Sequence, residues 1–233
     1  MIAFESVSFG YLPGRPFLRG VSVRIGPGLT LVAGPNGAGK STWLKLAAGV
    51  EPPDAGRVLI DGRDLWREEA AARAGLAYVS EQPDLTPYAT IEDILRLVSR
   101  VRRRPAGEAD EALARMGLER FAGRSVRELS LGQKRRAAFA AALIGSPDHL
   151  LLDEPLEAMD RASRDLIIDW ILRRKAEGAV AVVVSHDLEP FAAAADRVLA
   201  LREGTAVLRD VPRAAPEDRR AFLDRLARGE KAV

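Results

Sequence analysis

The chain has 233 residues, of which 47% are hydrophobic and 29% are charged, so it holds enough apolar side chains for one large or two small folded domains. Its 35 Lys and Arg residues nearly balance 33 Asp and Glu residues, and cysteine is absent, which excludes global disorder, a disulfide scaffold and a cysteine nucleophile and disfavours a nucleic-acid partner. No apolar run approaches about 18 residues, and the start lacks the order of a signal peptide, so we expect a cytoplasmic chain without a membrane span.

The first 60 residues predict a β layer around one strand–loop–helix unit. Apolar and polar residues alternate over 2–9, with a slip at Glu5–Ser6, and again over 21–25, which indicates half-buried strands. A short apolar run at 29–33 meets a glycine-rich segment, and helical spacing follows over 40–48. A further strand at 58–60 ends at the tight-turn pair Asp61–Gly62.

The rest of the chain alternates strands with helices, which favours an α/β fold with a parallel sheet. Continuous apolar runs are typical of parallel strands covered on both faces by helices. The pattern predicts strands at 76–79, 149–152 and 180–184, a charged helical insertion over 91–124, helices at 133–144 and 161–177, and a helical tail over 211–233. His149, at the start of one predicted strand, is interpreted as a strand-edge residue and not as a ligand.

Unusual polar residues follow each of the four predicted central strands. They are Gly34–Ser41 after the first strand, Ser80-Glu81-Gln82 after the second, Asp153-Glu154 after the third and Ser185-His186-Asp187 after the fourth. Ligands bind beyond the carboxyl ends of the strands in open parallel sheets, so the four ends predict one site.

The segment Gly34–Ser41 fits the pattern G-x-x-x-x-G-K-[ST] of a phosphate-binding loop. Glycines let backbone N–H groups turn toward phosphate oxygens, and the following helix directs its positive end at them. Lys40 adds a charge at the β- and γ-phosphates, and the Ser41 hydroxyl is a ligand for Mg²⁺. The alternative is a glycine-rich turn before a helix, which the preceding strand and following helix disfavour.

Two further motifs carry chemistry. Asp153 at a strand end is suited to the Mg²⁺ shell, and Glu154 beside it to orienting or deprotonating an attacking water. Ser130 and Gln133 fit a helix capping box, S-x-x-[EQ]. That segment is a well-capped helix start, an anion site, or both, because a capped helix still presents free N–H groups.

Together these motifs resemble the nucleotide-binding subunit of an ABC transporter over residues 1–211. Gly34–Ser41 resembles the Walker A motif, Leu150–Glu154 the Walker B motif and Leu129–Gln133 the signature Leu-Ser-Gly-Gly-Gln. Glu157–Asp160 lies at the position of the D-loop, His186 at that of the switch histidine, and Tyr11 at that of the aromatic residue that stacks on adenine. No Asn-Lys-x-Asp guanine motif is present, which disfavours a GTPase or an unrelated P-loop kinase.

The resemblance implies ATP and Mg²⁺ as ligands and assigns roles to individual residues. Catalytic roles fall on Glu154, His186 and Lys40, and Mg²⁺ contacts on Ser41, Asp153 and either Glu81 or Gln82. Nucleotide contacts fall on Tyr11, Gly34, Pro35, Asn36, Gly37, Ala38, Gly39, Lys40, Ser41, Thr42, Ser130, Gly132 and Gln133.

Three positions depart from the family pattern. Leu131 replaces the usual glycine of the signature, which requires its side chain to point away from phosphate. Glu157 replaces the D-loop serine, so a serine contact across a dimer interface is not carried over. By spacing from Thr90, Glu81 occupies the position of the Q-loop glutamine, although a slip of one residue would restore Gln82.

The expected fold is a P-loop NTPase core with a parallel sheet, an N-terminal antiparallel β layer and a helical insertion subdomain. We expect a single ATP-binding domain over 1–233, with a core from about 1–80 and 145–211, a helical subdomain from about 84–140 and a tail over 212–233. The resemblance implies a head-to-tail dimer with a second copy or a homologous ATPase subunit around two ATP molecules. It also implies a transmembrane permease partner that holds the chain at the inner face of the membrane. The alternative is a soluble ABC-type ATPase without a membrane partner.

Overall fold

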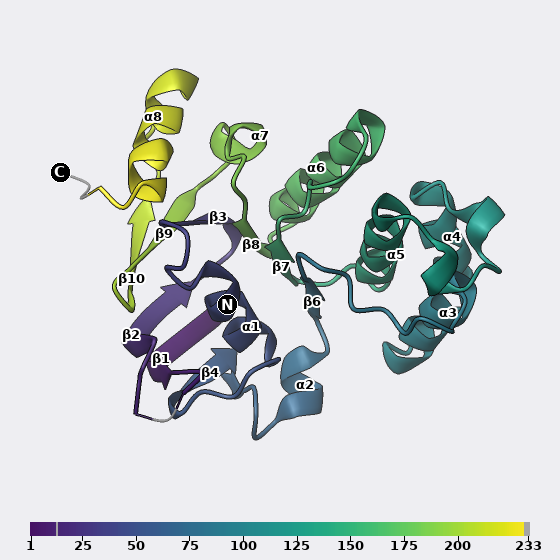
Figure 1. The fold of residues 1–233 in the computed structure, drawn as a ribbon, viewed down its shortest axis with the longest axis horizontal. Helices are drawn as coiled ribbons and strands as arrows, with labels where there is room; N and C mark the ends of the chain where they lie inside the picture. Colours follow the sequence, from purple (N-terminus) through teal and green to yellow (C-terminus); the bar gives the residue numbers. More distant parts are fainter. Residues whose placement is uncertain (13, 231–233) are drawn as a thin grey trace.

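The computed structural model describes residues 1–12 and 14–230 and contains two β-sheets in that part of the chain (Figure 1). The smaller sheet is antiparallel, with the strand order β2-β1-β4-β5. Its strands are β1 (Ile2–Phe9), β2 (Leu18–Ile25), β4 (Ala55–Ile60) and β5 (Arg63–Asp64). The predicted slip in β1 is a shift in register between Glu5 and Ser8, with Ser6 at a positive φ of 51°.

The larger sheet has the strand order β10-β9-β3-β8-β7-β6. All neighbouring strands are parallel except β10, which pairs antiparallel with β9. The strands are β3 (Gly28–Ala33), β6 (Leu76–Val79), β7 (His149–Asp153), β8 (Val180–Val184), β9 (Arg197–Arg202) and β10 (Thr205–Asp210). Each residue of β7 and β8 is buried, as the continuous apolar runs predict.

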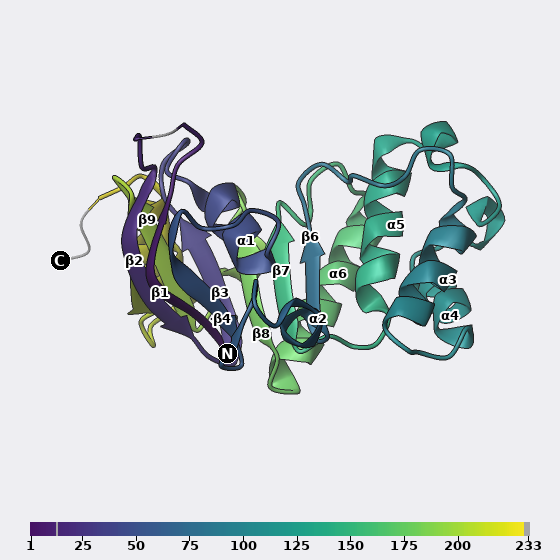
Figure 2. The same cartoon turned by 90° about the horizontal axis from the view of Figure 1, so that it is seen from below.

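Helix α1 lies between the two sheets (Figure 2). It carries an apolar surface that packs in one core cluster with residues of both sheets. The ring of Trp43 stacks on Phe4 of β1, with 4.6 Å between ring centroids. This packing fixes the start of α1 relative to the ends of the central strands. The α-helices are α1 (Lys40–Ala48), α2 (Glu69–Arg73), α3 (Ile91–Val101), α4 (Gly107–Arg115), α5 (Leu131–Leu143), α6 (Arg161–Ala176), α7 (Glu189–Ala192) and α8 (Pro216–Ala227).

Helices α3, α4 and α5 form a group beside the β6 edge of the sheet (Figures 1 and 2). Two 3₁₀ turns, Glu119–Phe121 and Val126–Glu128, connect α4 to α5. This group occupies the segment predicted as the helical insertion, while the proposed division of the chain stays a prediction. Helix α8 falls in the predicted tail, whose residues 231–233 lie outside the described part. Among the described residues, no helix has the length and apolar character needed to cross a bilayer.

His149 opens β7, as predicted, and its side chain is only 3% exposed. Its Nε2 lies 3.0 Å from the amino group of Met1 and 3.4 Å from Oδ1 of Asp61. Burial lowers the pKa of His149 below its ordinary value of 6.5, and the Met1 amino group lowers it further. The carboxylates of Asp61 and Asp148 and a backbone hydrogen bond with Gly75 oppose this decrease. The folded protein therefore favours a neutral imidazole.

We expect His149 to destabilise the fold as the pH falls below its unfolded pKa of 6.5. In that range the unfolded chain binds a proton that the folded chain excludes, so the free energy of unfolding rises with pH. His149→Gln removes this titration. The free energy of unfolding of the wild type, minus that of the variant, should therefore decrease from about pH 7.5 to about pH 5.5. Denaturant titrations at each pH measure this difference, and a constant difference would contradict the assignment.

Candidate functional site

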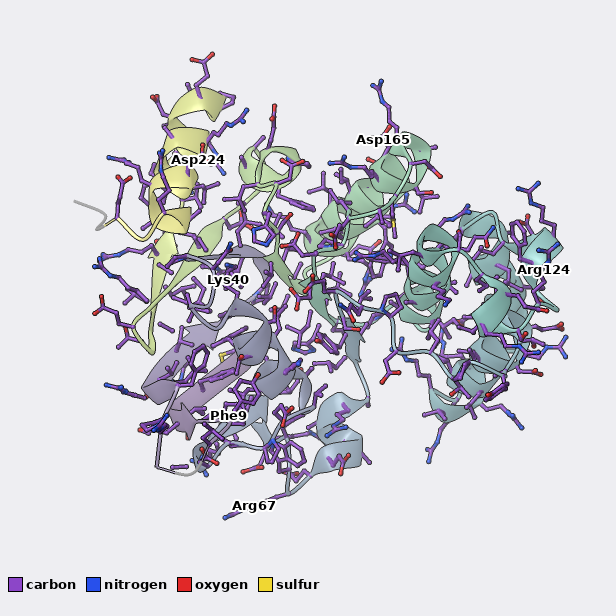
Figure 3. The ribbon with its side chains drawn as sticks, viewed as in Figure 1. Phe9, Lys40, Arg67, Arg124, Asp165 and Asp224 are labelled. Carbon is purple, nitrogen blue, oxygen red and sulfur yellow. The ribbon has the colours of Figure 1, made fainter. Side chains whose placement is uncertain are left out.

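The segments after β3, β6, β7 and β8 meet at one edge of the larger sheet and line a cavity of about 290 Å³. Figure 3 shows Lys40 at this place, between β3 and α1. The parallel register of the four strands brings their carboxyl ends together, as the sequence predicts. The lining residues are Phe17, Asn36, Gly37, Gly39, Lys40, Ser41, Thr42, Glu81, Asp153, Glu154, Val184 and His186.

The glycine-rich loop 34–41 curves around its own lysine. The Lys40 ammonium donates hydrogen bonds to the carbonyls of Gly34 at 2.9 Å and Pro35 at 3.2 Å. Gly39 has a φ of 98° and supplies no side-chain cap to α1, so N–H groups at the start of the helix remain free to bind an anion. Burial lowers the pKa of Lys40, while the charges of Glu154 and Asp153 oppose the decrease. This geometry suits a phosphate chain.

Asp153 ends β7 and is 3% exposed. Burial raises the pKa of Asp153, and the charge of Glu81 raises it further, whereas a hydrogen bond with Ser41 and nearby lysine charges lower it. Its Oδ1 is buried without a hydrogen-bond partner in the described residues. An unpartnered carboxylate oxygen beside a serine hydroxyl is a donor set that fits Mg²⁺, which prefers oxygen ligands.

Glu154 begins a turn in an unusual backbone conformation, with a φ of 47°. Its N–H donates to the carbonyl of Val184 at 2.9 Å, and its carboxylate accepts the N–H of His186 at 3.1 Å. The His186 imidazole is largely exposed, with Nε2 3.6 Å from the other carboxylate oxygen. Burial raises the pKa of Glu154, and the hydrogen bond and charge of His186 counteract that increase. The structure thus brings together Glu154 and His186, two of the three residues predicted to be catalytic, and the third, Lys40, lines the same cavity.

The adjacent residues Glu81 and Gln82 share one cavity, but only Glu81 also lines the phosphate cavity. Glu81 lines the cavity that holds Lys40 and Asp153. Both residues also line a neighbouring cavity of about 860 Å³ that reaches Leu85 and the helical group. That second cavity is also lined by Ser41 and Asp153, so the choice of Glu81 as the Q-loop residue stays a prediction.

We expect Glu81→Ala to lower the ATPase rate about tenfold, because a group beside the proposed metal ligand is lost. Glu81→Gln should retain most of the rate, since it restores the residue common in the family. Gln82→Ala is the matched control and should change the rate little. Steady-state phosphate release by the three variants, with the membrane partner present, measures these effects. A large loss in Gln82→Ala with a normal rate in Glu81→Ala would show that the register is wrong by one residue.

Tyr11 lies near the end of α1 that faces the cavity. Its hydroxyl is 2.9 Å from the hydroxyl of Thr42, and its ring meets Phe9 edge-on with 4.9 Å between centroids. The side chain is well exposed, at 57%. One face is therefore accessible to a flat ring, and the stacking of Tyr11 on adenine stays a prediction.

The signature segment forms a capped helix start. Ser130 accepts the N–H of Gln133 at 3.3 Å, while Gln133 Oε1 accepts the N–H of Ser130 at 2.9 Å. Leu131, the first residue of α5, is 54% exposed, and the expectation that its side chain points away from phosphate stays a prediction. Within one chain these residues, together with Gly132, are separate from the described lining of the phosphate cavity. A contact of Ser130 with nucleotide therefore requires a second chain and stays a prediction.

Arg135, for which the sequence predicted no role, is buried in α5 behind the signature segment. Its guanidinium contacts the carbonyl of Glu154 and the carboxylate of Glu157. Arginine at this position has no local pattern to mark it, because its partners are 19 and 22 residues away.

Comparison with known proteins decides the family. The sequence profile described as ABC transporter matches residues 18–157. This chain belongs to the ABC transporter family. The resemblance of the motifs is therefore confirmed.

Two relatives illustrate the range of the family. A sulfate/thiosulfate import ATP-binding protein of Mycobacterium tuberculosis is 37% identical over 181 residues, which are 76% of this chain and 51% of that protein. The chain thus spans about half the length of this relative. An energy-coupling factor transporter ATP-binding protein of Methanothermobacter thermautotrophicus is 33% identical over 221 residues, covering 91% of this chain and 71% of that protein.

Solved structures confirm the predicted fold class. The ATP-binding subunit of an ABC transporter superposes with a TM-score of 0.85 at 25% identity, covering 97% of both chains. A dimeric bacterial ABC transporter cassette superposes with a TM-score of 0.81 at 27% identity, covering 91% of this chain and 99% of that one. The same cassette type is also known in a post-hydrolysis state bound to ADP and phosphate, with a TM-score of 0.79 at 27% identity and the same coverage. The chain thus has the α/β fold of ABC ATPase cassettes.

Proposed function

We propose that this chain binds and hydrolyses ATP as the nucleotide-binding subunit of a membrane transporter. One observation carries the proposal: Lys40, Ser41, Asp153, Glu154 and His186, from three separate strand ends, line one cavity. A structural role for these residues does not explain why two carboxylates are buried beside each other at a glycine-rich loop. The transporter part rests on the relatives, which are ATP-binding proteins of transporters.

The phosphates of ATP are held by the N–H groups of the loop 34–41 and by Lys40, whose charge offsets theirs. Ser41 and Asp153 would hold Mg²⁺, which would supply positive charge to offset the negative charge of the phosphates. The Glu154 carboxylate orients a water and accepts its proton as the water oxygen bonds to the γ-phosphorus. The bond to the bridging oxygen breaks, and ADP and inorganic phosphate leave. His186 would donate a hydrogen bond to the γ-phosphate.

The second half of each site comes from another copy of the chain or from a homologous subunit. Ser130 and the N–H of Gly132 lie at an exposed helix start and would contact the γ-phosphate held by the partner's loop. Dimeric cassettes among the structural relatives support this arrangement. The cavity of about 860 Å³ beside Gln82 and Leu85 is the proposed contact with a transmembrane permease, which would hold the chain at the cytoplasmic face of the membrane.

The proposal is tested by phosphate release from MgATP with the purified chain. Wild type should release phosphate continuously. Lys40→Met should not, because the negative charge of the β- and γ-phosphates then lacks the positive charge of the lysine. Equal rates in the two proteins would contradict ATP hydrolysis at this site. Affinity purification from detergent-solubilised membranes should also recover a polytopic membrane protein, whereas recovery of the chain alone favours a soluble ABC-type ATPase.

A further inference from the structure

Arg135 joins the signature helix to the turn that holds the catalytic glutamate. It lies in the second turn of α5 and is 4% exposed. Its Nη1 donates to the carbonyl oxygen of Glu154 at 2.8 Å, and its Nη2 donates to the carboxylate of Glu157 at 2.5 Å. A planar guanidinium with two fixed N–H directions is suited to holding two acceptors at once.

The turn that Arg135 contacts is conformationally unfavourable. Glu154 and Ala158 both have positive φ values, 47° and 54°, a conformation that is unfavourable for non-glycine residues. The carbonyl of Glu154 also accepts the N–H of Glu157 at 3.2 Å, and the N–H of Glu154 donates to Val184. Both backbone polar groups of Glu154 are therefore held. This backbone sets the direction of the carboxylate that accepts the N–H of His186.

Helix α5 packs directly against the same turn. A Cβ on Gly132 would lie 3.0 Å from the carbonyl oxygen of Ala158, so glycine permits this close approach. Ser130, two residues earlier, begins the helix at the proposed contact with the partner's nucleotide. Glu157, which pairs with Arg135, stands where the family pattern has serine. The ion pair is thus a feature of this chain in addition to the shared motifs.

We infer that Arg135 is a positioning residue for ATP hydrolysis, which fixes the backbone of Glu154 and links its carboxylate to the signature end of α5. The inference rests on the proposed function, because it needs Glu154 as the group that orients water. Arg135 itself touches no substrate. Its loss should act on the rate of the chemical step more than on nucleotide binding, because its hydrogen bonds go to Glu154 and Glu157 and it is not among the described lining of the phosphate cavity.

The test compares Arg135→Met and Arg135→Lys with wild type in steady-state hydrolysis of MgATP. Arg135→Met should lower kcat about tenfold or more and leave KM within about twofold, because a small misplacement of a catalytic group is costly. Arg135→Lys should recover part of kcat, since an ammonium holds the carbonyl or the carboxylate but not both in the same geometry.

The matched control is Arg174→Met. Arg174 is a largely buried arginine, with 11% of its side chain exposed, and it pairs with the carboxylate of Glu177. It also donates to the backbone carbonyls of Ser146 and Pro147, but it lies at the opposite end of the sheet. We expect Arg174→Met to lower the melting temperature and to leave kcat within about twofold of wild type. An equal loss of kcat in both variants would overturn the inference, because general destabilisation would then explain it.

If Arg135→Met does not fold, Glu157→Gln is the variant that tests the inference. The Glu157 side chain is 56% exposed, so its substitution should not unfold the protein. It keeps an acceptor but removes the charge, and it should lower kcat about threefold without changing KM. A wild-type kcat in folded Arg135→Met would overturn the inference but not the proposed function. If Arg135→Met does not fold, a wild-type kcat in Glu157→Gln would do the same. Absence of ATPase activity in the wild-type protein would overturn the proposed function and the inference together.

Discussion

Glu154→Gln is expected to lower ATP turnover by about 10²-fold or more while ATP still binds. Glutamine preserves the shape of the side chain and an acceptor for the N–H of His186, but it lacks the charge that polarises and deprotonates water. The nucleotide contacts of the loop 34–41 are unchanged, because Glu154 lies on a different segment. ATP affinity should therefore stay within a few-fold of wild type, and a dimer with trapped ATP should accumulate.

The same substitution should raise thermal stability at neutral pH. Burial raises the pKa of Glu154, so keeping it ionised in the folded protein costs free energy that a neutral glutamine avoids. Each 1 kcal/mol gained raises the melting temperature by about 2–4 °C for a chain of this length. Phosphate release and a thermal melt on the same preparation measure both effects. Near-normal turnover in the folded variant would remove Glu154 from its role.

Ser130→Arg is expected to abolish hydrolysis while the monomer still binds ATP. Ser130 is exposed at the start of α5 and lies outside the described lining of its own chain's phosphate cavity. Arginine there adds bulk and charge where the partner's γ-phosphate would approach, so the nucleotide site that this residue faces should fail to close. The lost cap costs only about 1 kcal/mol of stability, too little to unfold the protein.

Ser125→Arg is the matched control for this substitution. Ser125 heads another capping box, in which Glu128 Oε2 accepts the N–H and the hydroxyl of Ser125, but it caps a 3₁₀ turn between α4 and α5. The Ser125→Arg variant should lose a similar amount of stability and keep the wild-type ATPase rate. ATP titration of the monomer and phosphate release are measured for both variants. A parallel loss of monomer affinity and turnover in Ser130→Arg would argue against a contact in trans.

Local patterns were sufficient to predict the parts of the site that lie on single segments. The loop 34–41, the carboxylates at 153–154 and the capping box of Ser130 and Gln133 each depend on residues within eight positions of one another. The strand periodicity then predicts that the first two meet, because parallel strands share one carboxyl edge. Their positions in the structure agree with those predictions, while their catalytic roles stay proposals.

Features that depend on distant partners were not predicted. The pairing of Arg135 with Glu157 joins α5 to the turn after β7, and neither residue carries a local signal. The hairpin of β9 and β10 was also missed, although Glu203 and Gly204 form a tight turn with φ values of 50° and 80°. The short apolar run of β9 does not differ in sequence from other buried segments. Its assignment as a strand depends on its parallel pairing with β3. The choice between Glu81 and Gln82 likewise depends on the path of the chain after β6.

The most direct test of the head-to-tail site is to mix the two inactive variants. In a mixed dimer of Glu154→Gln and Ser130→Arg, one site combines Glu154 and the loop of the Ser130→Arg chain with the intact Ser130 of the other chain. Random mixing of equal amounts should therefore restore about a quarter of the wild-type ATPase rate, since half of the dimers are mixed and each has one intact site. A mixture that hydrolyses ATP no faster than the average of the separate variants would contradict a site shared between two chains.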